Sequence, residues 1–346
     1  MDGREGMTPR GTPRVVASLA LALLVAAVVP QSAPAQANRV LVYAIVQQEE
    51  AARLVSLFRE RTGLAAEFVR GSGGTIVTRV IAERPNPRAD VVLGGASNLH
   101  LAMKAAGALL PYVSPITAAV PRTARDPVGY WTGFYYTALG FGVNVDRFKR
   151  KFGARPLPTS WEELADRAFR GEIVMTDPVA SSTAYLFLSG MLQLLGPEKG
   201  WQYFDRLVPN VAQFPSSGSA PPRMLGAGEY AIGISFVHSF GRVIEQGFPV
   251  KLVIPEPTPG EVGAVSIIAG GPNPEGARRF VEFMMSREAQ QAYTDLSYTT
   301  PVRTDVKLPP GAVPRHQIKL MKYDPEAAAR DRDAILREWT RRFGAR

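Results

Sequence analysis

The chain has 346 residues, a formal net charge of +9 at pH 7, three histidines and no cysteine. The absence of cysteine excludes disulfide bonds, thiol nucleophiles, Cys–zinc sites and iron–sulfur clusters. The basic residues are scattered and form no stripe of the kind that binds nucleic acid, so no nucleic-acid partner is predicted. Their charge favours an anionic small ligand, or else it is an ordinary solvated basic surface.

The first 37 residues have the composition of an export signal. Three arginines precede an apolar run over 15–29, and a small-residue Ala-Gln-Ala sequence ends at Ala37. This order is typical of a secretory signal peptide, and the run is shorter than the roughly 20 residues of a membrane-spanning helix. We therefore predict a signal peptide over 1–37, export through the Sec pathway, cleavage after Ala37 and a periplasmic protein. An uncleaved anchor is the alternative.

Short apolar runs alternate with amphipathic segments in the next part of the chain. The pattern predicts strands at 39–46, 65–69 and 89–93, and helices at 49–61, 75–83 and 98–106. Such alternation predicts βαβ units and a parallel sheet, in which ligands bind beyond the carboxyl ends of the strands. The loops to consider as binding loops are therefore 44–48, 70–74 and 94–97.

A proline-rich segment over 110–127 interrupts this alternation, and an aromatic-rich strand is predicted at 129–146. Further helices are predicted at 160–168, 184–195, 201–207, 219–227, 274–285, 287–294 and 325–346, and further strands at 172–175, 212–214, 231–236, 251–254 and 263–268. We predict two α/β lobes joined by crossings near 137–143 and 254–262, with residues 38–137 and 262–346 in lobe 1 and 138–261 in lobe 2. Two such crossings form a hinge that permits closure around a ligand.

Several sequence segments carry a family resemblance. "VLVYAIVQQEEAARLVSLFRERTGLAAEFVRGSGG", "ALGFGVNVDRF" and "PTSWEELADRAFRGEIVMTDP", in this order, resemble extracellular solute-binding proteins of family 1. The resemblance runs from Arg39 to about Val302, in the branch of ferric-iron, hexose-phosphate and pyridoxal-phosphate binders. It implies an α/β, type II periplasmic-binding-protein fold with a ligand in the interlobe cleft. It also implies an ABC permease of the inner membrane as partner. We further expect a monomer without a cofactor.

Ferric iron is the first ligand that this resemblance suggests. Iron binders of the branch place a His after the first strand, a Glu after the third and a Tyr-Tyr pair in the second lobe. The corresponding positions here are Gln47, Gly95 and Val237-His238, which supply no anionic oxygen ligands for Fe(III). The pair Tyr135-Tyr136 lies earlier, in strand-like sequence, and we interpret it as cleft wall or core. No metal site is predicted, and ferric iron is kept as the alternative ligand.

Two loops favour an oxyanion instead, in particular a phosphate ester or a phosphonate. The segment Arg70–Thr75 offers glycine N–H groups and the hydroxyls of Ser72 and Thr75 at a helix start. The residues Ser181–Thr183 place three hydroxyls before another helix, although capping needs only one. Helix capping is the alternative explanation for both segments.

His238 and Ser239 follow an apolar strand, and an imidazole at this point can donate a hydrogen bond to a phosphate oxygen. A lone histidine is also commonly structural. Hexose-phosphate binders of the branch have an acidic residue directly after this histidine, so Ser239 puts a hexose in doubt. An aromatic-rich cleft that includes Tyr135 suits a flat ring. Glu256 or Glu261, at the second crossing, is a candidate acceptor for a ligand hydroxyl or cation, or a hinge-surface charge.

An enzyme and a signalling subunit are the competing classes. No G-x-S-x-G, H-E-x-x-H or Cys–His pattern occurs, so no catalytic residue is predicted. A subunit that passes its ligand state to a sensor kinase would have the same fold. The predicted ligand-binding residues are Val46, Gln47, Ser72, Gly73, Gly74, Thr75, Gly95, Tyr135, Ser181, Ser182, Thr183, His238, Ser239 and Glu256.

Overall fold

The computed structural model describes residues 39–344. The predicted signal peptide and its cleavage site lie outside the described residues. Within 39–344, no helix combines the length and the apolar character that a membrane crossing requires.

The first half of the sheet is built from parallel strands with helices between them. β1 pairs with β2 on one side and β3 on the other, and β10 runs antiparallel beside β3. All six residues of β3 are buried, as expected of a strand covered on both faces. The elements are β1 (Arg39–Ala44), α1 (Gln48–Thr62), β2 (Ala65–Arg70), α2 (Gly73–Ala82), β3 (Val91–Ala96), α3 (Ser97–Ala105), β4 (Leu109–Leu110), α4 (Pro115–Ala118), β10 (Gly260–Ile268), α10 (Pro274–Met284), α11 (Arg287–Ser297) and β11 (Thr300–Pro301).

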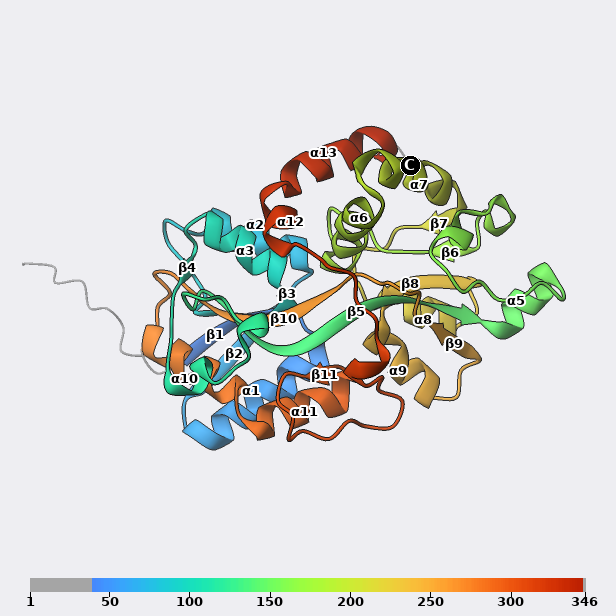
Figure 1. Cartoon of the computed structure of the whole chain (residues 1–346). Helices are drawn as coiled ribbons and strands as arrows, with labels where there is room; N and C mark the ends of the chain where they lie inside the picture. Colours follow the sequence, from blue (N-terminus) through green and yellow to red (C-terminus); the bar gives the residue numbers. More distant parts are fainter. Residues whose placement is uncertain (1–38, 345–346) are drawn as a thin grey trace, which may run out of the picture. The chain divides into compact units, whose positions relative to one another are not determined.

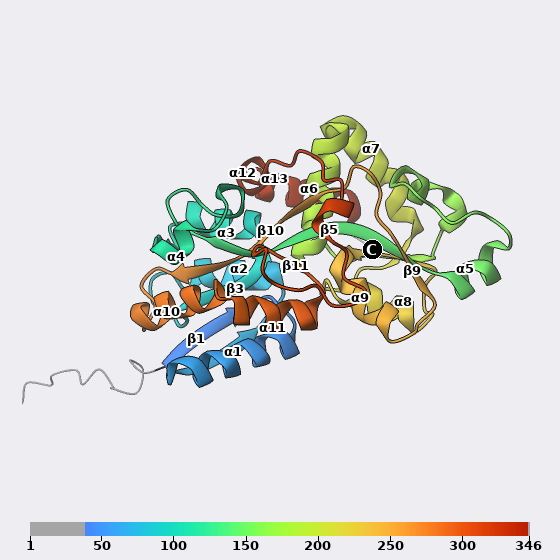
Figure 2. The same cartoon turned by 60° about the horizontal axis from the view of Figure 1, so that its bottom comes forward.

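β5 (Thr132–Asn144) belongs to both halves of the sheet (Figures 1 and 2). Its first residues pair with β10 and β11, and residues 139–144 pair with β8 and β9. Gly142 of β5 is needed for close packing, because a Cβ there would lie 2.5 Å from the Phe240 ring and 2.6 Å from Leu225. β5 therefore contributes to both halves of the sheet, and it includes residues 137–143.

The second half of the sheet has the order β5-β8-β6-β7, and β9 pairs with the other edge of β5. Its elements are α5 (Val145–Phe152), β6 (Ile173–Val174), α6 (Ser182–Leu195), α7 (Pro197–Leu207), β7 (Val211–Gln213), α8 (Ala220–Gly226), β8 (Ile232–Phe236), α9 (Val237–Glu245) and β9 (Val250–Val253). Each half has its own large apolar core, one around Phe58 and Phe280, the other around Phe187 and Phe204.

The C-terminal segment forms α12 (Pro325–Arg330) and α13 (Arg332–Phe343), whereas one continuous helix was predicted. Trp339 of α13 packs edge-on against Phe204 with their ring centroids 5.7 Å apart, in the core of the second half. The predicted lobe 1 extended to residue 346, so this packing differs from that assignment. The amphipathic pattern indicated a buried face but not which half it would contact.

One further prediction about the elements was wrong, and some helices, α5 and α9 among them, were not predicted. The predicted helix at 160–168 is a pair of 3-10 turns, Glu162–Ala165 and Arg167–Phe169, because the Asp166 carboxylate accepts from Ala168 N and starts a new turn. α9 was not predicted, since it follows β8 without a loop between them.

Candidate functional site

A cavity of about 190 Å³ lies where several helices begin. The first residues or N-caps of α1, α2, α6 and α9 line it, and so does Ser219, which precedes α8. Helix N-termini present free N–H groups and a partial positive charge. Their convergence makes the cavity favourable for an anion.

The residues Ser181–Thr183 at the start of α6 line the cavity with three hydroxyls. The Ser181 side chain makes no cap hydrogen bond, and among the described residues none of the three hydroxyls has a hydrogen-bond partner. Ser72, the N-cap of α2, likewise makes no side-chain cap bond, and its hydroxyl pairs with that of Thr75 at 2.8 Å. Capping therefore does not account for the hydroxyls at α6, which are free to donate to a ligand.

Arg70, the last residue of β2, supplies a cation to the same cavity. Its Nη2 lies 3.4 Å from Ser217 Oγ, which belongs to the second half of the sheet. Its Nε is buried without a hydrogen-bond partner in the described structure. A buried donor of this kind is costly unless something accepts from it, so Arg70 is suited to hold an anion.

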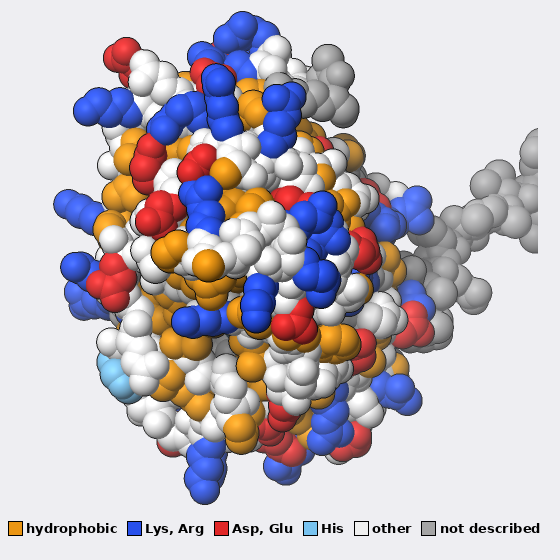
Figure 3. Space-filling model, turned by 90° about the vertical axis from the view of Figure 1, so that its right-hand side faces the viewer, with side chains coloured by type: hydrophobic (Ala, Val, Ile, Leu, Met, Phe, Trp, Pro, Cys, Tyr) orange, Lys and Arg blue, Asp and Glu red, His pale blue; other side chains and the backbone are white. Residues whose placement is uncertain are grey.

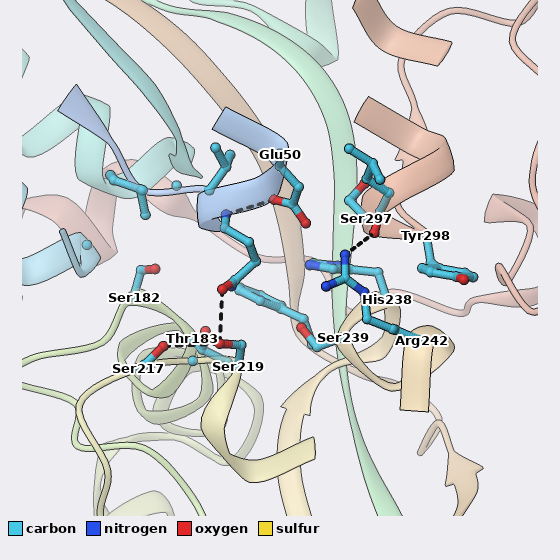
Figure 4. A pocket seen from close by; sticks show the side chains of 18 of the residues that line it. Glu50, Ser182, Thr183, Ser217, Ser219, His238, Ser239, Arg242, Ser297 and Tyr298 are labelled. Carbon is cyan, nitrogen blue, oxygen red and sulfur yellow. Dashed lines mark hydrogen bonds between the residues drawn. The ribbon is translucent and has the colours of Figure 1, made fainter. Parts of the chain in front are cut away.

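Gln47 and Glu50 form a capping box at the start of α1. Gln47 N donates to Glu50 Oε2 at 2.8 Å, and Ser219 Oγ donates to Gln47 Oε1 at 3.1 Å across the cavity (Figure 4). Burial is the main influence on the Glu50 carboxyl and raises its pKa to about 7. A carboxyl group in that range changes charge near neutral pH.

His238 lies in the first turn of α9 and faces the cavity between aromatic rings. It stacks on Phe236 at 5.2 Å between centroids and meets the Tyr135 ring edge-on at 6.2 Å. Burial lowers the pKa of His238 to about 3, so the imidazole is neutral at pH 7. A neutral imidazole can donate from one nitrogen and accept at the other.

Tyr135 is seated over the backbone of β10. A Cβ on Gly263 would lie 1.9 Å from the tyrosine ring, so glycine at this position makes room for it. Burial raises the pKa of Tyr135 to about 12, which keeps the phenol protonated. This placement suits the interpretation of Tyr135 as cleft wall.

The opposite end of the cavity is formed by α9 and the end of α11. Arg242 of α9 donates to Leu296 O at 2.9 Å and pairs with Glu49 at 3.4 Å. Tyr298 adopts a left-handed backbone conformation, with φ of 61°, and donates to Glu245 of α9. These contacts join the two halves of the sheet beside the cavity.

The cavity brings together eleven of the fourteen predicted ligand-binding residues, namely Val46, Gln47, Ser72, Gly73, Gly95, Tyr135, Ser181, Ser182, Thr183, His238 and Ser239. Three do not line it. Glu256 lies in the turn before β10 with its side chain 60% exposed, 3.9 Å from Lys319, where water solvates its charge. Thr75 is exposed on α2. Gly74 contacts the second half of the same chain, where its N–H donates to Ala180 O at 3.3 Å.

Several lining residues were not predicted as ligand-binding, including Glu50, Arg70, Ser217, Ser219, Arg242 and Tyr298. The Ser217-Gly-Ser219 sequence before α8 carries the same signal as Ser181–Thr183 and could have been found from the sequence. Arg242 and Tyr298 carry no such signal, because only the folded chain brings the end of α11 to α9.

Charges of both signs lie outside the cavity, on the face of the protein beside α5. Figure 3 shows, on the face beside α5, Lys and Arg side chains interspersed with Asp and Glu and not gathered into one patch. Within residues 39–344, no three His, Asp or Glu side chains gather as a possible metal-binding group.

The fold and the cavity together are those of a solute-binding protein. The chain belongs to the bacterial extracellular solute-binding proteins, whose family profile matches residues 86–325. The predicted family and the type II periplasmic-binding-protein fold are thereby confirmed.

Particular relatives extend this comparison. The chain is 30% identical to an uncharacterized protein of Haemophilus influenzae over 94% of its own length and 96% of that protein. It is 28% identical to a putative 2-aminoethylphosphonate-binding periplasmic protein of Salmonella typhimurium, covering 72% of this chain and 73% of the relative.

Solved structures of periplasmic binding proteins are similar to this chain. The periplasmic binding protein AfuA from Actinobacillus pleuropneumoniae, with fructose-6-phosphate bound, superimposes with a TM-score of 0.85 at 30% identity, over 88% of this chain and 98% of AfuA. The apo ferric ion-binding protein A of Pasteurella haemolytica has a TM-score of 0.75 at 20% identity, over 88% and 98% of the two chains, and shares the fold.

Proposed function

We propose that this protein is the periplasmic receptor of an ABC importer and that it closes around a small ligand bearing a phosphate or phosphonate group. The observation that carries this proposal is the set of three hydroxyls at the start of α6, which have no hydrogen-bond partner among residues 39–344 and share a cavity with the Arg70 guanidinium. Hydroxyls, a helix N-terminus and a guanidinium together match the acceptor oxygens of a phosphoryl or phosphonyl group. The fructose-6-phosphate bound to AfuA and the 2-aminoethylphosphonate after which the Salmonella relative is named support this class.

The lobe division predicted from the sequence, with β5 and the segment before β10 as hinge crossings, supplies the closing motion in this proposal. The protein would act as a monomer, deliver its ligand unchanged to an inner-membrane permease and need no cofactor. Ferric iron is disfavoured, since Gln47, Gly95 and His238 stand where iron binders of the branch have anionic oxygen ligands. A purified protein that turned over phosphate esters would contradict the proposal that it only binds.

The first test identifies the ligand. Native mass spectrometry of protein purified without refolding, followed by thermal-shift screening, would compare phosphate esters, phosphonates, phosphorylated vitamins and Fe(III). We expect a phosphate ester or a phosphonate to raise the melting temperature and Fe(III) to leave it unchanged.

The second test addresses the site. Ser182→Ala and His238→Ala should each weaken the ligand so identified by about 1.5–3 kcal/mol, the loss of a buried charge-assisted hydrogen bond. Both variants should keep the unfolding midpoint of the unligated protein within a few degrees. Calorimetric affinities that stay at the wild-type value in both variants would contradict the site.

A further inference from the structure

Glu50 is the most deeply buried carboxyl group that lines the cavity. Its side chain belongs to the first turn of α1, and the residue is only 5% exposed. One carboxylate oxygen, Oε2, accepts from Gln47 N at 2.8 Å. The other oxygen has no hydrogen-bond partner in the described part of the chain, and no ion pair involving Glu50 occurs there.

Two arginines lie near enough to lower the pKa of Glu50, but neither forms an ion pair with it in the described structure. Arg242 pairs with Glu49 and donates to Leu296 O, and Arg70 Nη2 lies beside Ser217 of the second half. Glu50 thus keeps a lone-pair-bearing oxygen toward the cavity. Since burial of an unpaired carboxylate is costly, a partner supplied by the ligand would relieve that cost.

The helix cap alone does not require a carboxylate. A glutamine at the third position of a capping box accepts from the cap N–H just as a glutamate does, and it carries no charge to desolvate. The feature that glutamate adds is a carboxyl group facing the cavity, which is a negative acceptor once it has lost its proton above about pH 7.

The two ends of the cavity differ in the hydrogen-bonding groups that they present. Figure 4 shows Ser182, Thr183, Ser217 and Ser219 grouped on one side, apart from Glu50 on the α1 side. The grouped hydroxyls suit acceptor oxygens, whereas Glu50 suits a donor. One ligand that satisfies both must carry an anionic group and, elsewhere on its frame, a hydrogen-bond donor.

We propose that Glu50 is a specificity-determining residue that accepts a hydrogen bond from an ammonium or hydroxyl group on the ligand, so that the site selects phosphates or phosphonates with a second, donor function. This inference rests on the proposed function and narrows its ligand class. Simple alkyl phosphonates would satisfy the hydroxyl side of the cavity and leave Glu50 buried without its partner.

The test compares three phosphonates of nearly equal size by isothermal titration calorimetry: ethylphosphonate, 2-hydroxyethylphosphonate and 2-aminoethylphosphonate. The wild-type protein should prefer at least one donor-bearing compound over ethylphosphonate by about tenfold or more, as one charge-assisted hydrogen bond allows. Glu50→Gln should abolish the preference for the amino compound, because its amide lacks the charge that holds an ammonium. It should keep a preference for the hydroxyl compound, because its carbonyl still accepts. Glu50→Ala should abolish both preferences.

Two controls keep the outcomes apart. Glu60→Gln, on the exposed part of α1, should leave all three affinities unchanged. Glu50→Gln should bind ethylphosphonate within about twofold of wild type, since the capping box survives. If the wild type binds all three compounds within twofold, or both Glu50 variants keep the wild-type preferences, the role of Glu50 is refuted and the proposed function stands. If no phosphonate and no phosphate ester binds the wild type, the proposed function is refuted and the role of Glu50 with it.

Discussion

The two walls of the cavity carry different chemistry. The wall from the second half of the sheet presents hydroxyls at the starts of α6 and α8, His238, and the guanidinium groups of Arg223 and Arg242. The wall from the first half carries both carboxylates of the cavity, Glu49 and Glu50, and the guanidinium of Arg70. The difference indicates a division of labour in which the hydroxyls of the second half and Arg70 hold an anionic group, and the carboxylates of the first half distinguish what else the ligand carries.

The walls also contact each other directly. Ser219 donates to Gln47, Arg70 reaches Ser217, and Gly74 N donates to Ala180 O at 3.3 Å. Each of these contacts joins a residue of one half to a residue of the other. The two walls of the cavity are therefore in contact in this structure. Substitutions at these three contacts should affect ligand binding more than folding.

The largest expected effect is on the stability of the unligated protein. It concerns Glu261 of β10, which lies outside the cavity where the two halves of the sheet meet. Asn98 N of α3 donates to its Oε2 at 3.2 Å, and burial raises the pKa of Glu261 to about 8. Beside it, Tyr323 lies within hydrogen-bonding distance of both Asn98 of the first half and Ser189 of the second. This cluster is shared by both halves and is nearly closed to water.

The raised pKa predicts how the stability of the unligated protein depends on pH. Folded Glu261 keeps a proton that the unfolded chain has lost above about pH 4.5, so its contribution to stability is complete below that pH and lost as the pH rises through about 8. Glu261→Gln should raise the free energy of unfolding at pH 9 by about 2–4 kcal/mol and change it little at pH 4. Urea titrations of the wild type and of Glu261→Gln between pH 4 and pH 9 test this prediction. Free energies of unfolding that depend on pH in the same way in both proteins would contradict it.

Arg70→Gln should cause the largest loss of affinity among changes to a single wall. It removes the charge whose Nε has no protein acceptor in the described structure, at an expected cost of about 1.5–3 kcal/mol in ligand binding. Arg53→Gln, on the exposed face of α1, is the matched control and should bind as wild type does. Calorimetry measures both, and equal affinities would show that the anion does not reach the first wall.

Gly74→Ala tests the contact between the walls. A Cβ at Gly74 would lie 2.5 Å from Val179 O on the opposing wall, so bringing the walls together should cost about 1–2 kcal/mol of binding energy. The same change replaces glycine in the first turn of α2, which should hold or slightly raise the stability of the unligated protein. Weaker binding without loss of stability is the expected result. A simultaneous loss of both would indicate a folding defect instead.

The sequence predicted the two walls unequally well. On the second wall, hydroxyls directly before a helix are a local signal, and Ser181–Thr183 were identified from it. On the first wall, the sequence does not distinguish Glu50 from an ordinary acidic residue in the first turn of a helix. Its burial depends on strands far away in sequence. The alternation of strands and helices likewise predicted β1 to α3 closely, since each is a local pattern, whereas the position of α13 depends on tertiary packing.

The smallest expected effects concern two residues that the sequence placed in the site and the structure does not. Glu256→Gln and Thr75→Ala alter exposed side chains outside the cavity, and each should change the ligand affinity by less than about 0.5 kcal/mol. Thr75 also stands next to Gly74, so its variant separates the backbone contact from a general disturbance of α2. A calorimetric loss beyond 1 kcal/mol in Glu256→Gln would move the ligand toward the hinge crossing and away from the α1 wall. The division between the two walls would then have to be redrawn around that crossing.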